Sequence, residues 1–62
     1  MSFVPAFGVG DFVKIKPLEG RHGRVIELIR YDDAWLFVVR YMRDGDVKMM
    51  RCLVDELEPT EA

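Results

Sequence analysis

Turn-forming residues recur so closely along this chain that they leave room only for short secondary-structure elements. Glycines, prolines and aspartate pairs interrupt every apolar segment, at Gly10, residues 17–23, residues 32–33 and the pair Asp44-Gly45. Between these interruptions the chain is rich in Val, Ile, Phe, Trp and Tyr, which favour strands. A chain of 62 residues divided in this way is predicted to be all-β, with short strands and tight turns.

Four segments read as strands: 11–16, 24–30, 34–41 and 47–54. Segment 34–41 is the strongest, with large apolar side chains alternating on both faces. Segment 24–30 does not alternate cleanly, which predicts a bulge or burial on both faces. The pair Asp44-Gly45 predicts a two-residue hairpin turn. Gly20 and Gly23 are expected in a loop over residues 17–23, where both can take positive φ.

The last segment, DELEP, reads as a single helical turn with Asp55 as its cap and Leu57 inserted into the core before a short final strand. The predicted fold is therefore a five-stranded, SH3-like, partly open barrel with a short 3-10 turn before the last strand. We expect an extended N-terminal segment over 1–9, the barrel over 10–59 and an acidic tail over 60–62. Phe3, Val4 and Phe7 are expected to pack on the barrel or on a partner.

Composition limits the class of protein. Half of the residues are apolar, which is enough for a core, and the single cysteine, Cys52, excludes an intrachain disulfide. No signal peptide and no apolar run long enough for a membrane span is evident. We therefore expect a soluble, cytoplasmic protein that does not act at a membrane.

Charge is distributed unevenly. The net charge is −2, but residues 1–52 contain nine basic and seven acidic residues, whereas residues 53–62 contain four acidic residues and no basic one. The first segment therefore has a charge of +2 and the second a charge of −4. The overall sign weighs against general binding to a polyanion.

Catalytic and cofactor motifs are lacking. His22 is the only histidine and Ser2 the only serine, so one chain cannot supply a Ser/His/Asp triad or a histidine metal site. Neither a GxGxxG sequence nor a P-loop is present. We expect no catalytic residues, metal, cofactor or small-molecule substrate, and a protein that is not an enzyme.

Apolar side chains on both faces of segment 34–41 predict a protein interface, because so small a barrel has only one interior. Adjacent methionines on a strand point to opposite faces, so one of the pair at 49–50 is exposed. The predicted interface residues are Trp35, Leu36, Val38, Met49 and Met50. They are expected to bind a partner protein or a second copy of the chain.

Basic residues give the alternative, nucleic-acid binding. Its predicted residues are Arg21, His22, Arg24, Arg30, Tyr31 and Lys48, with Tyr31 offering a base-stacking surface. Two other expectations remain for the arginines: they bind an acidic protein partner, or they pair with acidic residues across strands, namely Glu19, Glu27, Asp32, Asp33, Asp44 and Asp46.

The pattern Gly-Asp-x-Val-x-Ile, a glycine-containing loop and Gly-x-Val resembles the KOW-type motif of SH3-like barrels in ribosomal proteins and transcription elongation factors. Its matching positions are Gly10, Asp11, Val13, Ile15, Gly20, Gly23 and Val25. The closing VVRY and LVDELEP segments also look like the end of small SH3-like barrels. The resemblance implies RNA contact through a basic loop, which Arg21, His22 and Arg24 match in kind.

The segment FGVGDFVKIK, residues 7–16, is similar to the opening of the plasmid-borne type II dihydrofolate reductases, which are SH3-like tetramers. This resemblance implies a tetramer with a shared pore as a further alternative. In that family a Val-Gln-Ile-Tyr stretch lines the pore. The counterpart here, VKMM at 47–50, has neither the glutamine nor the tyrosine, so the resemblance implies shared architecture rather than shared chemistry.

Overall fold

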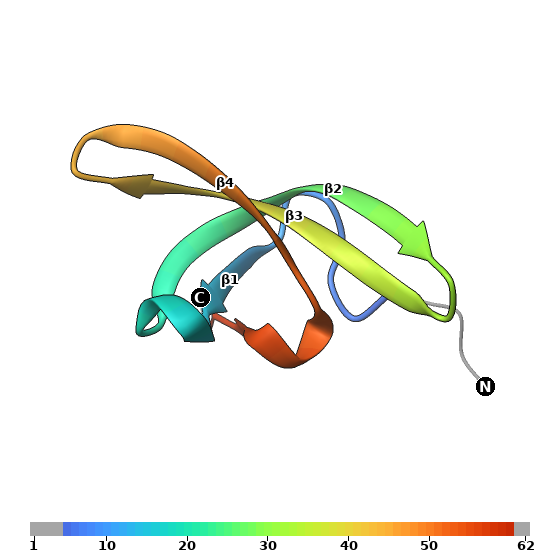
Figure 1. Cartoon of the computed structure of the whole chain (residues 1–62). Coiled ribbons are helices and arrows are strands. Elements are labelled where there is room, and N and C mark those ends of the chain that lie inside the picture. Colours follow the sequence, from blue (N-terminus) through green and yellow to red (C-terminus); the bar gives the residue numbers. More distant parts are fainter. Residues whose placement is uncertain (1–4, 61–62) are drawn as a thin grey trace.

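The computed structural model describes residues 5–60 and contains one antiparallel sheet. Its strands are β1 (Phe12–Ile15), β2 (Arg21–Tyr31), β3 (Ala34–Arg43), β4 (Asp46–Cys52) and β5 (Leu57–Pro59), in the order β4-β3-β2-β1-β5 (Figure 1). Two 3-10 turns, η1 (Lys16–Leu18) and η2 (Val54–Glu56), precede β2 and β5. The sheet does not close between β4 and β5, so the predicted all-β class, the five strands, the open barrel and the final 3-10 turn are confirmed.

Strand β2 belongs to both halves of the sheet. Its first four residues pair with β1, and its longer remainder pairs with β3. The register against β3 shifts between Val25 and Glu27, so Ile26 forms a bulge, as the irregular pattern of this segment predicts. The bulge bends β2, and the sheet curls around one core.

The core lies on the concave side of this curl. Its buried side chains are Val13, Ile15, Val25, Phe37, Val39, Cys52 and Leu57. Phe7 covers one end, where its ring packs edge-on against Phe37 with 5.6 Å between the ring centroids. This confirms the expected packing of Phe7, whereas Phe3 and Val4 lie outside the described residues. Among residues 5–60, no helix is long and apolar enough to cross a membrane.

The loop predicted over residues 17–23 is shorter than expected. Gly20 has the predicted positive φ of 75°, but β2 already begins at Arg21, and Gly23 is a buried strand residue without positive φ. A Cβ atom at Gly23 would lie 2.5 Å from Val39 Cγ1 and 3.0 Å from the carbonyl oxygen of Arg40. Gly23 is therefore required for close packing in the core and not for a turn.

At the two ends of β4 the structure confirms the predicted hairpin turn and corrects the predicted cap of η2. Asp44 and Gly45 both have positive φ, 53° and 82°, as the predicted hairpin turn requires. Asp55, however, does not cap η2 and lies inside it. The capping carboxylate belongs to Glu56, whose Oε1 accepts a hydrogen bond of 2.9 Å from the Leu53 backbone N–H. A glutamate reaches back over three residues as in a capping box.

Replacing Gly23 by alanine should destabilise the fold by about 1–3 kcal/mol, because the new methyl group overpacks the core against Val39. Urea unfolding measures this change. Gly8→Ala is the matched control, since its Cβ would meet nothing closer than Asp11 Oδ2 at 3.9 Å. Equal stability of the two variants would contradict the role given to Gly23.

Candidate binding face

The side of the sheet that faces away from the core, called the outer face below, contains a row of four residues, one from each of β1 to β4. Phe12 pairs with Arg24, Arg24 with Arg40, and Arg40 with Met49. Directly opposite residues in an antiparallel sheet project to the same face. The four side chains, called the arginine row below, therefore lie next to one another, and all four are exposed.

The two arginines of the row face each other without a compensating acid. Among residues 5–60, no carboxylate oxygen lies within 4.0 Å of the guanidinium of Arg24 or Arg40. Arg24 instead lies over the ring of Phe12, 5.5 Å from its centroid. Like charges directly opposite each other on a sheet are destabilising. The row is thus a place where an anionic group from outside would be stabilised.

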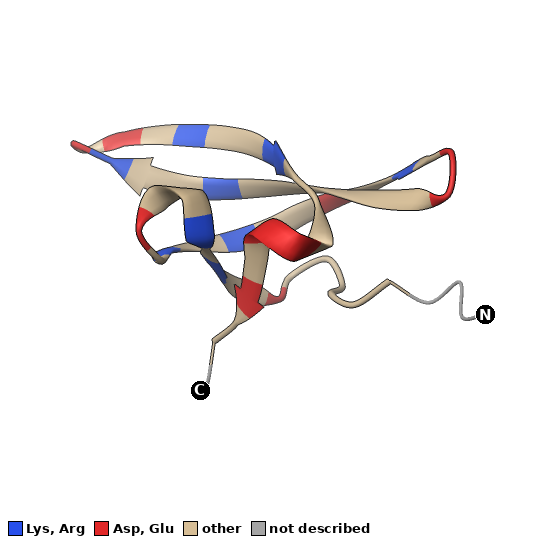
Figure 2. Cartoon of the chain, turned by 60° about the horizontal axis from the view of Figure 1, so that its bottom comes forward, with Lys and Arg blue, Asp and Glu red and all other residues tan. Residues whose placement is uncertain are grey.

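Most of the acidic residues are placed away from the arginine row. Figure 2 shows them at the tips of both hairpins, around η2 and β5, before β1 and after η1, whereas most basic residues lie along the strands. Glu27 is the exception, because it lies within β2. An ion pair joins Lys16 to Glu58 at 4.0 Å, away from the arginine row. The expectation that strand acids neutralise the arginines is therefore wrong for Arg21, Arg24 and Arg40. Acids favour turns because they tolerate left-handed backbone, as Asp32 and Asp44 do here.

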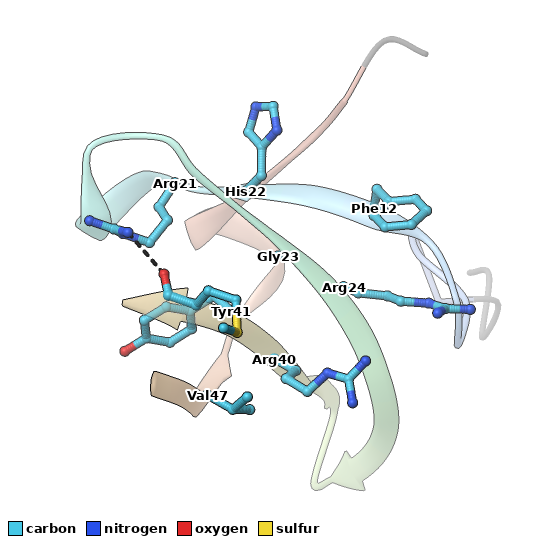
Figure 3. A pocket seen from close by; sticks show the side chains of 9 residues that line it. Phe12, Arg21, His22, Gly23, Arg24, Arg40, Tyr41 and Val47 are labelled. Carbon is cyan, nitrogen blue, oxygen red and sulfur yellow. Dashed lines mark hydrogen bonds between the residues drawn. The ribbon is translucent and has the colours of Figure 1, made fainter. Parts of the chain in front are cut away.

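A hollow of about 720 Å³ opens beside the arginine row (Figure 3). Phe12, Arg24, Arg40 and Val47 contribute to its lining, so all four strands take part. The guanidinium of Arg21 donates a hydrogen bond of 2.9 Å to the carbonyl oxygen of Met42, which ties the start of β2 to the end of β3. This hydrogen bond therefore links β2 and β3 on the side of the hollow where the two strands separate.

Apolar side chains extend the outer face toward the other end of the sheet. Its register places Ile29 opposite Leu36, and Val38 between Glu27 and Arg51. A second hollow, of about 400 Å³, lies here beside Val38 and Met49. The apolar residues of the outer face are Phe12, Ile29, Leu36, Val38, Met42, Val47 and Met49. Glu27 is the one acidic residue among the outer-face positions of β1 to β4.

The structure places the residues predicted for a protein interface on two opposite sides of the sheet. Leu36, Val38 and Met49 lie on the outer face, as a shared surface requires. Trp35 and Met50 lie on the opposite side and pack against the core. Trp35 also contacts the guanidinium of Arg30, which lies 5.3 Å from the centroid of its ring.

The residues predicted for nucleic-acid binding are also divided. Arg21, His22 and Arg24 line the larger hollow together, with the ring of His22 turned away from Arg40 and Val47 (Figure 3). Arg30 and Tyr31 lie at the far end of β2, roughly 20 Å or more along the strand. Lys48 pairs with Tyr41 and projects to the opposite side.

Phe12 and Val47 belong to the hollow but were not predicted as site residues. The period-two alternation of β1 and β4 was the available signal, because it places both side chains outside the core. The register that brings them together depends on non-local pairing, which no local pattern specifies.

No nucleophile is available in the described core. Burial raises the pKa of the Cys52 thiol to about 11, and the nearby Glu56 carboxylate adds to the rise. A neutral thiol is a poor nucleophile. Within residues 5–60, no group of three or more His, Cys, Asp or Glu residues is arranged to hold a metal ion.

Comparisons of the chain with protein-family models, with curated proteins and with solved structures found no match. The proposals below therefore rest on the residues and geometry of the sheet.

Cys52 should react very slowly with a disulfide reagent in the folded protein below pH 9.0, and rapidly after unfolding, because its thiol is buried and protonated. The pKa of this thiol in the folded protein is above its ordinary value of 9.0, so the unfolded state loses the proton first as pH rises. The stability that the protonated Cys52 thiol contributes to the folded state is fully present below pH 9.0 and is lost as pH rises above it. Cys52 is the only cysteine, so the labelling rate reports on it alone. Fast labelling of the native protein would contradict this placement.

Proposed function

We propose that this chain is a protein-interaction module whose outer face binds a partner protein that presents apolar side chains flanked by carboxylates. The observation that supports the proposal is the arginine row, in which two arginines without an ion-pair partner among residues 5–60 lie beside exposed apolar side chains. This proposal keeps the predicted interface residues Leu36, Val38 and Met49, and replaces Trp35 and Met50 by residues of the row.

The apolar part of the outer face favours a protein as the ligand. Phe12, Val47 and Met49 are each more than half exposed. Several exposed apolar side chains on one face of a sheet are typical of interaction sites. Aromatic residues, methionine and arginine are also the residue types enriched in protein interfaces.

The arginines favour acidic groups on that partner. A guanidinium binds a carboxylate through two parallel hydrogen bonds, and Arg24 and Arg40 are not engaged by carboxylates of the described chain. A basic partner would add further repulsion to a pair that already repels, so the row also selects against such partners.

Single-stranded nucleic acid is the second candidate ligand, and one observation favours it. Phe12 is exposed beside Arg24, and the neighbouring register pair on the same face is Lys14 and His22. An exposed ring flanked by basic side chains is the arrangement on which a base stacks and a phosphate is bound. This group replaces Tyr31 by Phe12 as the stacking residue.

Two labelled probes test the proposal by fluorescence anisotropy. The first is a peptide in which Asp and Glu alternate with Leu and Phe, and the second is a single-stranded oligonucleotide. We expect the peptide to bind the wild-type protein and Arg40→Glu to weaken binding by about tenfold or more, because the carboxylates then meet a like charge. Arg43→Glu is the matched control: it makes the same charge change on the same strand, but Arg43 lies beside a different hollow.

The probes also separate the two candidates. A peptide with serine in place of Leu and Phe should bind more weakly if apolar contacts contribute. Stronger binding of the oligonucleotide, with an affinity that falls steeply with salt, would favour the nucleic-acid candidate instead. Equal losses in Arg40→Glu and Arg43→Glu, or no binding of either probe, would contradict a site at the arginine row.

A further inference from the structure

The two edge strands of the sheet, β5 and β4, are protected to very different degrees against pairing with a further strand. Strand β5 has only three residues and ends in Pro59, which has no backbone N–H, and Thr60 beyond it is anchored by a 3.0 Å hydrogen bond to the carbonyl oxygen of Phe12. Short strands and prolines are the usual means of blocking an edge. The edge at β5 is therefore closed to further pairing.

The edge at β4 has none of these protections. It has seven residues without proline or glycine, and its register against β3 runs from Asp46 to Cys52 without a bulge. Within the described chain, β4 pairs with β3 alone in the sheet. Its free side therefore presents a row of N–H and C=O groups that a second strand would satisfy.

We infer that β4 pairs antiparallel with β4 of a second copy of this chain, about a two-fold axis through Met49. Residues directly opposite each other across an antiparallel pair project to the same side of the sheet, and side chains alternate sides along a strand. In a pair of identical strands, opposed residues are therefore an even number of positions apart, so the two-fold axis passes through a residue and not between two residues. With the axis at Met49, all seven residues of β4 are paired. Val47 then faces Arg51, Lys48 faces Met50 and Asp46 faces Cys52, so no like charges are directly opposed.

The neighbouring registers are less favourable. With the axis at Lys48, two lysines face each other, which is destabilising. With the axis at Met50, Asp46 and Val47 lose their partners within the strand. Charge and strand length therefore both select the register centred on Met49.

The pairing also joins the two outer faces. Met49, which is 63% exposed in the single chain, would meet its own copy, and this contact removes apolar surface from water. The Arg40 residues of the two copies would lie three strand spacings apart, about 14 Å. That separation exceeds the Debye length of about 8 Å at physiological salt, so repulsion between them is weak. The inference concerns the edge of the sheet and does not depend on the function proposed for its face.

Sedimentation equilibrium of the full chain and of charged variants at position 49 tests this inference. We expect the wild-type protein to dimerise and Met49→Lys and Met49→Glu each to raise the dissociation constant by about tenfold or more, because like charges then meet at the axis. An equimolar mixture of the two variants should form the heterodimer, since opposite charges then face each other. This rescue is specific to the register centred on Met49.

Val9→Lys is the control, because Val9 is equally exposed at 64% and lies in the segment before β1. It should leave the dimer unchanged, and urea unfolding of each variant checks that the chain itself remains folded. A monomeric wild-type protein at high micromolar concentration, or a dimer that both charged variants retain, would overturn the inference. A monomer that still binds the acidic peptide would overturn only the edge pairing, and a dimer that does not bind it would overturn only the proposed function.

Discussion

The close packing of Val39 against the backbone of Gly23 is the contact on which the arrangement of this sheet depends. At the next residue, Arg24, β2 changes its partner from β1 to β3, and the side chains of Val39 and Ile15 occupy the space that a side chain at residue 23 would need. The bulge at Ile26 supplies the bend that follows this change. Together they let a sheet of five short strands enclose a core of seven buried side chains.

The same change of partner creates the outer face. Because β2 pairs with β1 and β3 at Arg24, this residue has Phe12 on one side and Arg40 on the other. Aspartates lie in turns, where they and the left-handed backbone suit each other, and Glu27 on the outer face has no carboxylate oxygen within 4.0 Å of either guanidinium. Positive charge and apolar surface are thus brought together by the path of the backbone, in a chain whose net charge is negative.

Local sequence patterns were sufficient to predict the strands, turns and bulge, which depend mainly on neighbouring residues. Alternation in residues 34–41 correctly predicted a strand with apolar side chains on both faces, and the pair Asp44-Gly45 correctly marked a hairpin. The irregular pattern after Arg24 predicted either a bulge or burial on both faces, and the structure has the bulge. Gly23 was assigned to a loop because a glycine that makes room for a neighbouring strand looks the same in sequence as one that takes positive φ.

The candidate site was predicted only in part, for a related reason. Alternation tells which face a side chain occupies, but not which residues of other strands lie beside it. Arg21, His22 and Arg24 are neighbours in sequence and line the same hollow, whereas the position of Arg40 opposite Arg24 follows from a register that only the folded sheet defines. Long apolar side chains at the sheet margin were the hardest to place, since Trp35 and Met50 cover the core and Met49 does not.

The central claim, that the opposed arginines are present for binding and not for stability, is tested most directly by the free energy of unfolding of Arg40→Met. The substitution keeps a long apolar stem at an exposed strand position and removes the repulsion with Arg24. If the account is correct, urea unfolding will show the variant to be as stable as the wild-type protein or more stable by about 0.2–1 kcal/mol. A loss of more than about 1 kcal/mol would contradict it, because Arg40 would then have a structural role of its own.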